Sequence, residues 1–175
     1  MSNLQVKKRG WKSYRLEQVC EILSGVRLTK AEQIDGDRPF IGATESNNGI
    51  TDFIANSNRS LDNNVLGVNY NGSVVENFYH PYLAIFSDDV KRLKWRNKDG
   101  QNRYCYLFLK QMLLMQKEKY AYGYKFNGER MKKQNIMLPI SHHQGIDYLF
   151  MGNYMKLQEF IKIYHILNKL AFKGD

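Results

Sequence analysis

The sequence predicts an α+β protein: a globular domain built on an antiparallel-rich, twisted sheet with short helices, followed by a long C-terminal helix. Three observations lead to this prediction. Residues 38–87 consist of short apolar or alternating runs separated by Asn and Gly, which is typical of strands joined by turns. Residues 103–120 have the apolar spacing of a helix instead. Beyond residue 141 the chain contains no proline and repeats its apolar residues every three or four positions. We therefore expect two units, residues 1–140 and 141–175.

The chain before residue 90 is expected to begin with a helix and to continue with strands. Residues 11–24 have the spacing of a short amphipathic helix that ends at Gly25; its apolar residues are Leu16, Val19, Cys20, Ile22 and Leu23. The runs PFIGA, GITDFIA, NVLGVNYNGSVV and NFYHPYLAIFS are expected as strands. Asn71-Gly72 predicts a type I′ turn within the third run, and the Asn-rich residues 56–64 predict a surface loop.

A second helix is expected over residues 103–120, with a strand after it. One side of this helix carries Tyr104, Leu107, Phe108, Met112 and Met115. Gly123 and Gly128 interrupt the helical pattern and predict an exposed loop. The short apolar run of residues 135–140 predicts a strand that ends at Pro139.

The C-terminal helix has two candidate starts and a wide apolar face. Ser141 to Gln144 has the S-x-x-Q form of a capping box, and Asp147 is a competing N-cap. A heptad-like seam, interrupted by one polar residue, consists of Ile146, Phe150, Asn153, Leu157, Phe160, Tyr164, Leu167 and Ala171. The face is widened beyond a two-stranded seam by Leu149, Ile163, Ile166 and Leu170. We expect a partner helix against this face; packing on its own domain is the alternative.

The composition is that of a globular protein whose positive charge is concentrated in one segment. The chain is 43% hydrophobic and 25% charged, and its net charge is +9. Residues 91–133 contain 13 Lys or Arg and 3 acidic residues, whereas the other 132 residues contain 13 basic and 14 acidic ones. Such a concentrated excess favours a polyanionic partner, and a solvated basic helix face is the alternative. Two separated cysteines, no secretory signal and no apolar run of about 18 residues predict a cytoplasmic protein without a membrane partner.

The sequence contains no pattern typical of a catalytic, cofactor or metal site. A nucleic-acid methyltransferase would need a glycine-rich cofactor loop and an Asn/Asp-Pro-Pro-aromatic element, and neither is present. Asp88-Asp89 is interpreted as a turn or helix cap, with the metal site of a small nuclease as the alternative. His142-His143 is interpreted as part of a cap with solvated rings. His80 could pack beside aromatic residues or donate to a phosphate. We therefore predict a protein that is not an enzyme.

Several polar loops carry the side chain types that recognise nucleic acids. Lys and Arg neutralise phosphates, Asn and Gln pair with adenine edges, and Ser and Thr serve as donors or acceptors. We expect contacts with double-stranded DNA from Arg27, Lys30, Thr44, Glu45, Ser46, Asn47, Asn48, Asn71, Ser73, Tyr79, Lys94, Arg96, Asn97, Lys98, Tyr122, Tyr124, Lys125 and Arg130. We expect helix pairing through Phe150, Leu157, Phe160, Tyr164 and Leu167.

An ordered set of elements along residues 11–140 resembles one known family. The elements are Trp11, Leu16-Glu17-x-Val19-x-Glu21-Ile22-x-x-Gly25, Pro39-Phe40-Ile41-Gly42-Ala43-Thr44-x-x-Asn47-Asn48-Gly49-Ile50, Asn71-Gly72-Ser73, Phe78-Tyr79-His80, Asp88-Asp89-Val90-x-x-Leu93, Tyr122-Gly123-Tyr124-Lys125 and Ile136-x-Leu138-Pro139. They resemble a target-recognition domain of the DNA-specificity subunits of type I restriction-modification systems. The helix that opens Asp147-Tyr148-x-Phe150-Met151 resembles the helical region behind such a domain.

The resemblance implies a non-catalytic subunit that reads one half of a split DNA sequence and docks on methyltransferase subunits, with the restriction subunit as a further partner. Family members usually carry two recognition domains and two helical regions, whereas this chain carries one of each. It therefore implies a half-subunit that homodimerises through its C-terminal helix, or else a truncated or solitary copy. A protein-interaction module that does not read DNA is a third alternative. Because family members that read different sequences share Asn47-Asn48-Gly49, Glu45 and Ser46 are the better candidates for base contacts in that loop.

Overall fold

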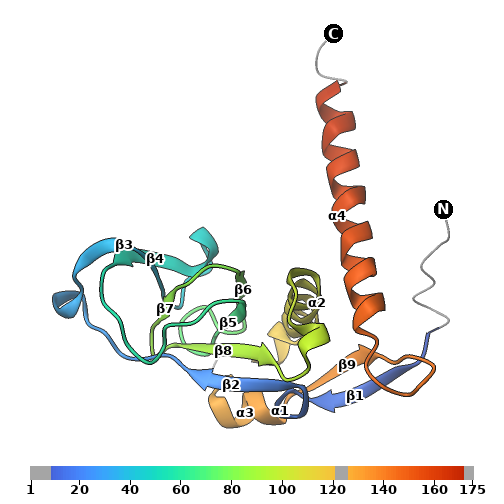
Figure 1. The fold of residues 1–175 in the computed structure, drawn as a ribbon, viewed down its shortest axis with the longest axis horizontal. Helices are drawn as coiled ribbons and strands as arrows, with labels where there is room; N and C mark the ends of the chain where they lie inside the picture. Colours follow the sequence, from blue (N-terminus) through green and yellow to red (C-terminus); the bar gives the residue numbers. More distant parts are fainter. Residues whose placement is uncertain (1–8, 121–125, 172–175) are drawn as a thin grey trace.

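The computed structural model describes residues 9–120 and 126–171 (Figure 1). The strands in these residues are β1 (Trp11–Arg15), β2 (Cys20–Ser24), β3 (Asp35–Ile41), β4 (Ile50–Ile54), β5 (Val65–Asn69), β6 (Asn77–His80), β7 (Ile85–Phe86), β8 (Val90–Trp95) and β9 (Asn135–Pro139). The α-helices are α1 (Leu16–Val19), α2 (Arg103–Leu114), α3 (Gly128–Lys133) and α4 (Tyr148–Ala171). Single 3-10 turns are η2 (Lys30–Glu32), η3 (Asn47–Gly49), η4 (Lys98–Gly100) and η5 (Lys117–Tyr120).

The predicted antiparallel-rich sheet region is confirmed. The central sheet has the strand order β2-β8-β5-β6, and all its neighbouring strands are antiparallel. A second sheet has the order β4-β3-β7, in which β3 pairs antiparallel with β4 and parallel with β7. The third sheet pairs β1 with β9 and places Trp11 opposite Pro139. In Figure 1 the β4-β3-β7 sheet lies at the left and the β1-β9 pair at the right, with the central sheet between them.

The short helix predicted between Trp11 and Ser24 is wrong for most of its length. Only Leu16–Val19 is helical, and strands precede and follow it. Leu16 and Val19 are buried and fill one helical turn, but β1 pairs along β9 and β2 along β8. The apolar spacing is compatible with either structure over so few residues, and pairing with distant strands decides between them. The strand predicted over residues 135–140 is confirmed as β9.

The connection between β5 and β6 is a hairpin loop, but not the predicted type I′ turn. A type I′ turn requires a positive φ at both central residues. Gly72 has a φ of 60°, whereas Asn71 is not among the described residues with a positive φ. The strands are instead joined by residues 70–76, in which Val75 also has a positive φ, of 70°. This longer loop places its polar side chains at the end of the central sheet.

The helix predicted over residues 103–120 is confirmed as α2 up to Leu114, but its last part is wrong because residues 117–120 form a 3-10 turn. The most buried side of α2 is also not the predicted one. Cys105, Tyr106 and Leu113 are fully buried, whereas Met115, on the predicted face, is 66% exposed. The reason is that α2 packs on β5 and β6 with one side and on α4 with another. The main core lies beneath α2 and combines side chains from α1, β5, β8, α3, β9 and the base of α4.

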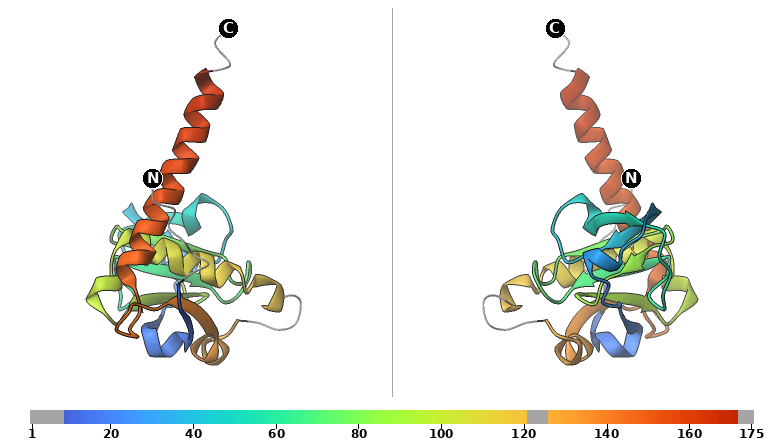
Figure 2. Two further views of the ribbon diagram at one scale, coloured as in Figure 1. Left: turned by 90° about the vertical axis from the view of Figure 1, so that its right-hand side faces the viewer. Right: turned by 90° about the vertical axis from the view of Figure 1, so that its left-hand side faces the viewer.

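α4 extends away from the globular part (Figures 1 and 2). The Asp147 carboxylate accepts a hydrogen bond from the Phe150 N–H at 2.9 Å and pairs with Arg9. The competing N-cap therefore begins the helix, and the predicted capping box at Ser141 is wrong because these residues form a turn. Phe150 is buried, whereas the distal Phe160 is 59% exposed. None of the helices in the described part of the chain has the length and hydropathy to cross a membrane.

Candidate nucleic-acid interface

Two polar loops lie side by side at one end of the central sheet. Residues 42–49 follow β3, and residues 70–76 join β5 to β6. Asn69 Nδ2 donates to the Thr44 carbonyl at 2.9 Å. Gly72 approaches Ala43 so closely that a Cβ would lie 2.9 Å from the Ala43 carbonyl oxygen. Asn71 Nδ2 donates to Asp89 Oδ1 at 2.9 Å, which joins the turn at residues 87–89 to the second loop. We call residues 42–49, 70–76 and 87–89 the loop cluster.

The first loop of the cluster has an unusual backbone. Asn47, Asn48 and Gly49 have consecutive φ values of 49°, 55° and 79°. Asn and Gly are the residues that adopt this left-handed conformation most readily. The Gly42 N–H donates to the Gly49 carbonyl at 3.0 Å and closes the loop. The sequence NNG is therefore explained by the turn that it forms.

The loop cluster exposes polar side chains that the fold does not use. The side chains of Glu45, Asn47 and Ser73 make no hydrogen bond or ion pair within the described residues. Thr44 and Ser46 pair with each other through their hydroxyl groups at 3.1 Å. Asn amides and carboxylates are suited to adenine and cytosine edges, respectively. These side chains have the chemistry for direct base contacts.

Lysines at the edge of the loop cluster balance its acidic groups. Lys117 pairs with Glu76, which raises the pKa of Lys117, and the Glu45 carboxylate contributes to the same shift. Lys91 lies 4.6 Å from the ring centroid of Tyr70 and donates to Ser24 Oγ at 2.9 Å. Burial lowers the pKa of Lys91, and the Asp88 carboxylate opposes that shift.

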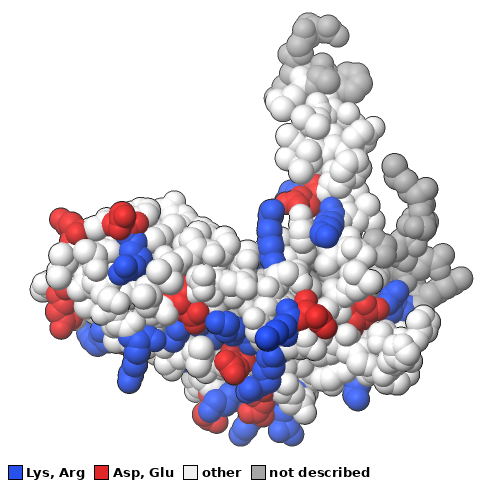
Figure 3. Space-filling model, in the orientation of Figure 1, with Lys and Arg blue, Asp and Glu red and all other residues white. Residues whose placement is uncertain are grey.

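The basic segment of residues 91–133 is largely paired within the fold. Twelve of its 13 cations are described, and eight of these make a hydrogen bond or ion pair with the protein: Lys91, Arg92, Lys94, Arg96, Arg103, Lys110, Lys117 and Lys132. Figure 3 shows Lys and Arg side chains interspersed with acidic ones over the lower part of the molecule in that view. The segment is thus less purely cationic in the fold than in the sequence.

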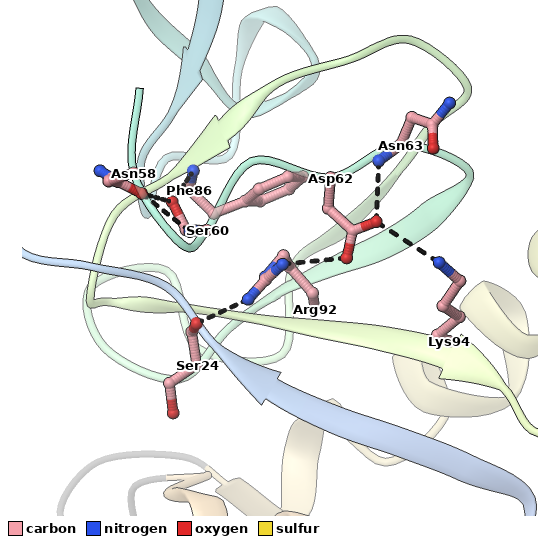
Figure 4. Close-up of polar contacts among 8 residues, drawn as sticks. All are labelled: Ser24, Asn58, Ser60, Asp62, Asn63, Phe86, Arg92 and Lys94. Atoms are coloured by element: carbon pink, nitrogen blue, oxygen red, sulfur yellow. Dashed lines mark hydrogen bonds and ion pairs between the residues drawn. The ribbon is translucent and has the colours of Figure 1, made fainter. Parts of the chain in front are cut away.

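One of these pairs is buried and joins three parts of the chain (Figure 4). Arg92 Nη1 donates to Asp62 Oδ2 at 2.9 Å, and Arg92 Nη2 donates to the Ser24 carbonyl at 2.9 Å. The side chains of Arg92 and Asp62 are only 6% and 12% exposed, respectively. Lys94 reaches the same carboxylate at 3.5 Å. The network ties the predicted loop 56–64, which is confirmed as irregular, to β8 and β2.

The structure separates Arg96, Asn97 and Lys98 from the loop cluster. They follow the opposite end of β8, a strand of six residues and thus about 20 Å long. Arg96 Nε donates to the Glu17 carbonyl at 3.1 Å, and Asn97 Oδ1 accepts from the Asp99 N–H at 2.8 Å. The Lys98 side chain has no partner within the described residues. The predicted residues therefore fall into two separate groups.

The other predicted site residues have different surroundings. Arg27 lies 3.8 Å from Asp88, beside the loop cluster, whereas Lys30 pairs with Asp52 on the β4-β3-β7 sheet. The Tyr79 hydroxyl donates to Asn64 Oδ1 at 3.0 Å, and its ring stacks on Tyr106 at 5.2 Å. Arg130 lies on α3. Tyr122, Tyr124 and Lys125 lie outside the described residues.

Residues 80–82 contribute to the cluster in a way that the sequence does not reveal. Asn48 Nδ2 donates to the Tyr82 hydroxyl at 2.8 Å, and His80 Nδ1 lies 3.3 Å from the same oxygen. Asp88-Asp89 forms the predicted turn, with Asp88 beside Arg27 and Asp89 bound to Asn71. No group of three or more His, Cys, Asp or Glu side chains placed to hold a metal ion occurs in the described ranges.

The fold is that of the S subunits of type I restriction-modification systems. An S subunit from M. genitalium superposes with a TM-score of 0.67 over 97% of this chain and 45% of its own length, at 17% identity. The HsdS subunit from Thermoanaerobacter tengcongensis gives a TM-score of 0.62 over 100% of this chain and 42% of its own length, at 13% identity. The predicted recognition-domain fold is thereby confirmed.

Residues 8–171 match the family described as the type I restriction modification DNA specificity domain, and the chain belongs to this family. It is also 57% identical over 154 residues to the type II restriction enzyme specificity subunit S.BcgI of Heyndrickxia coagulans. That match covers 88% of this chain and 45% of the relative, so the chain spans about half the length of this relative. The resemblance noted in the sequence is confirmed.

Proposed function

We propose that this chain reads part of a double-stranded DNA sequence for a restriction-modification system and carries out no catalysis itself. Family membership supports this role, and one observation supports the loop cluster as its location. Glu45, Asn47 and Ser73 lie on two joined loops, and their side chains make no hydrogen bond or ion pair within the described part of the fold. Polar side chains that a rigid scaffold presents without internal partners are free to read base edges.

The phosphate contacts come from cations that make no hydrogen bond or ion pair within the described residues. Within the described part of the basic segment these are Lys98, Lys119 and Lys133. Contacts to phosphates fix the register of a protein on the duplex without carrying sequence information. Lys98 and the loop cluster lie at opposite ends of β8, a separation that allows one domain to engage both backbone and bases.

α4 joins this domain to its partners in the proposed assembly. Six large apolar side chains in its distal half are 50–64% exposed: Phe160, Ile163, Tyr164, Ile166, Leu167 and Leu170. At about 100° per residue these side chains spread over roughly 160° of the helix surface. A two-stranded seam of a and d positions is narrower. The width suits a second copy of α4 on one side and a methyltransferase subunit on the other.

The test of DNA reading is selection from a library of randomised duplexes by the full chain, alone and with its methyltransferase subunit. The bound fraction is sequenced, and the preferred duplex is then titrated at several salt concentrations. We expect one enriched half-site. Equal recovery of all sequences would refute the proposal, and metal-dependent cleavage by the chain alone would establish the nuclease alternative instead.

Two classes of variant distinguish base contacts from phosphate contacts. Asn47→Ala should relax selectivity at one or two base pairs, by about 1–3 kcal/mol if the amide is bidentate. Lys98→Ala should weaken binding to all duplexes alike and reduce the salt slope by about 0.9. Lys169→Ala, which removes the same charge from the distal part of α4, is the matched control. A uniform loss with Asn47→Ala would assign this residue to the scaffold.

A further inference from the structure

The first loop of the cluster is held by a chain of polar contacts that begins in the core. His80, the last residue of β6, is fully buried. Its Nδ1 lies 3.3 Å from the Tyr82 hydroxyl, and this hydroxyl accepts a hydrogen bond from Asn48 Nδ2 at 2.8 Å. The contact joins residues that are 34 positions apart in the sequence. Asn48 lies next to Asn47, whose side chain makes no hydrogen bond to any described residue.

We call the hydrogen bond from Asn48 to the Tyr82 hydroxyl the tether. The tether holds a backbone conformation that a chain rarely adopts for three residues in succession. Asn47, Asn48 and Gly49 are all left-handed, and each non-glycine residue in this region has an unfavourable conformational energy. Gly49 is packed so that a Cβ would meet Ile41 at 3.2 Å and Phe78 at 3.3 Å. The packing anchors one end of the turn. The Asn48–Tyr82 hydrogen bond anchors its middle.

His80 supports Tyr82 as a neutral, fixed group. Burial lowers the pKa of His80 to about 4, and the Lys110 ammonium acts in the same direction. The imidazole is therefore uncharged near neutral pH, and either tautomer can pair with a hydroxyl. Its ring meets Phe86 and Tyr82 edge to face, at 5.2 and 5.7 Å. The imidazole cannot easily move away from the Tyr82 hydroxyl.

From this geometry we infer that Tyr82 is a positioning residue for sequence discrimination, which acts through Asn48 to fix where the neighbouring Asn47 and Glu45 meet the DNA. The inference rests on the proposed function. It assigns Asn48 to the scaffold, and it gives Tyr82 and His80 a role in specificity without contact to DNA. Loss of the tether leaves the loop able to sample other conformations, so the side chains meet correct and incorrect bases with less difference in affinity.

The test compares Tyr82→Phe with Tyr104→Phe. Both rings are half-buried, and the Tyr104 hydroxyl donates to Glu159 Oε2 at 2.9 Å beside α4, away from the loop cluster. Each protein is titrated with the preferred duplex and with duplexes that carry one substituted base pair. We expect Tyr82→Phe to lower discrimination about tenfold, the effect of one hydrogen bond, at one or two positions. The salt slope should stay that of the wild type, and Tyr104→Phe should keep the wild-type discrimination.

Asn48→Gly cuts the same tether from its other end and tolerates the left-handed backbone. If Tyr82 acts through Asn48, the double variant discriminates no worse than either single variant. Additive losses would show that Tyr82 contacts DNA directly and would overturn the inference. Wild-type discrimination by both single variants would overturn it as well, while the proposed function would stand. A wild-type protein that binds all duplexes alike would overturn both.

Discussion

Replacing Asp62 with alanine should destabilise the protein far more than replacing Asp52, although both carboxylates form ion pairs: Asp62 with Arg92 and Lys94, and Asp52 with Lys30. Asp62 pairs with Arg92 at 2.9 Å, and Arg92 is 5% exposed. Asp52 pairs with Lys30, whose side chain is 75% exposed. Asp62→Ala leaves a guanidinium in the interior without a counterion, whereas Asp52→Ala leaves an ammonium in water.

The expected magnitude follows from desolvation. Removing one partner of a buried pair typically costs about 3–5 kcal/mol, because the other charge stays buried and uncompensated. Burial already lowers the pKa of Arg92, and the Asp62 carboxylate is the main factor that opposes this shift. In Asp62→Ala, Arg92 Nη2 keeps its hydrogen bond to the Ser24 carbonyl. We therefore expect the loss of unfolding free energy to lie at the lower end of this range, at about 3 kcal/mol. For Asp52→Ala, an exposed pair, we expect about 0–1 kcal/mol.

The measurement is equilibrium unfolding in urea, with the free energy taken from midpoint and slope. A difference between the two variants of less than about 1 kcal/mol would refute the reasoning. The double variant Asp62→Leu with Arg92→Met provides a further check, because replacing a buried pair by apolar side chains is often neutral or stabilising. It should recover most of the loss. If it unfolds as easily as Asp62→Ala, the loss reflects packing and not an unpaired charge.

Three other contacts give measurable outcomes. The folded pKa of His80, about 4, lies below its unfolded value of 6.5, so the unfolded chain binds more protons between these values. Lowering the pH from about 7.5 to 5 should therefore reduce the unfolding free energy by about 2 kcal/mol in urea titrations, and His80→Gln should abolish this dependence. Phe160→Glu with Leu167→Glu should convert the proposed dimer, of about 41 kDa or twice 20.6 kDa, to monomer in light scattering while near-UV circular dichroism stays unchanged; a persisting dimer would exclude pairing through α4. Asp147→Ala removes an N-cap and should cost about 1–2 kcal/mol in urea unfolding, more than Asp147→Asn, which keeps a capping oxygen.

The strands of the fold could be predicted because their local signals agree with their tertiary partners. In residues 38–87, each of the four predicted runs contains at least part of a strand, although the run NVLGVNYNGSVV ends in a loop and NFYHPYLAIFS contains both β6 and β7. The helix predicted for residues 11–24 was wrong for the opposite reason. Leu16 and Val19 have helical spacing over a single turn, while the ladders from Trp11 to Pro139 and from Cys20 to Trp95 involve partners far along the chain. Local spacing carries no information about such partners.

The candidate site was predictable in its loops but not in the groups that hold them. The polar composition of residues 44–48 and 71–73 marks both loops, and the close approach of Gly72 to Ala43 explains why they meet. The support from Tyr82 comes from 34 residues away. The sequence Tyr79-His80-Pro81-Tyr82 signals an aromatic cluster, but it does not reveal which hydroxyl reaches Asn48.

Charge counting along the sequence overstated the cationic surface, for a physical reason. Acidic residues from outside the basic segment, namely Glu21, Asp62, Glu76 and Glu159, pair with its cations in the fold. If all 13 cations met phosphates, the segment would contribute about −12 to the slope of log K against log salt. The three described lysines without a hydrogen bond or ion pair, together with Lys125, which lies outside the described residues, would contribute about −4. Since internal ion pairs release no counterions when DNA binds, the structure favours a slope nearer the smaller value. Lys91 and Lys110 donate to neutral oxygens of Ser24 and Asn77, and each would add about −0.9 if it met a phosphate. Six of the described cations of this segment thus pair with carboxylates inside the fold, and two of them, Arg92 and Lys94, hold the loop at residues 56–64 against β8.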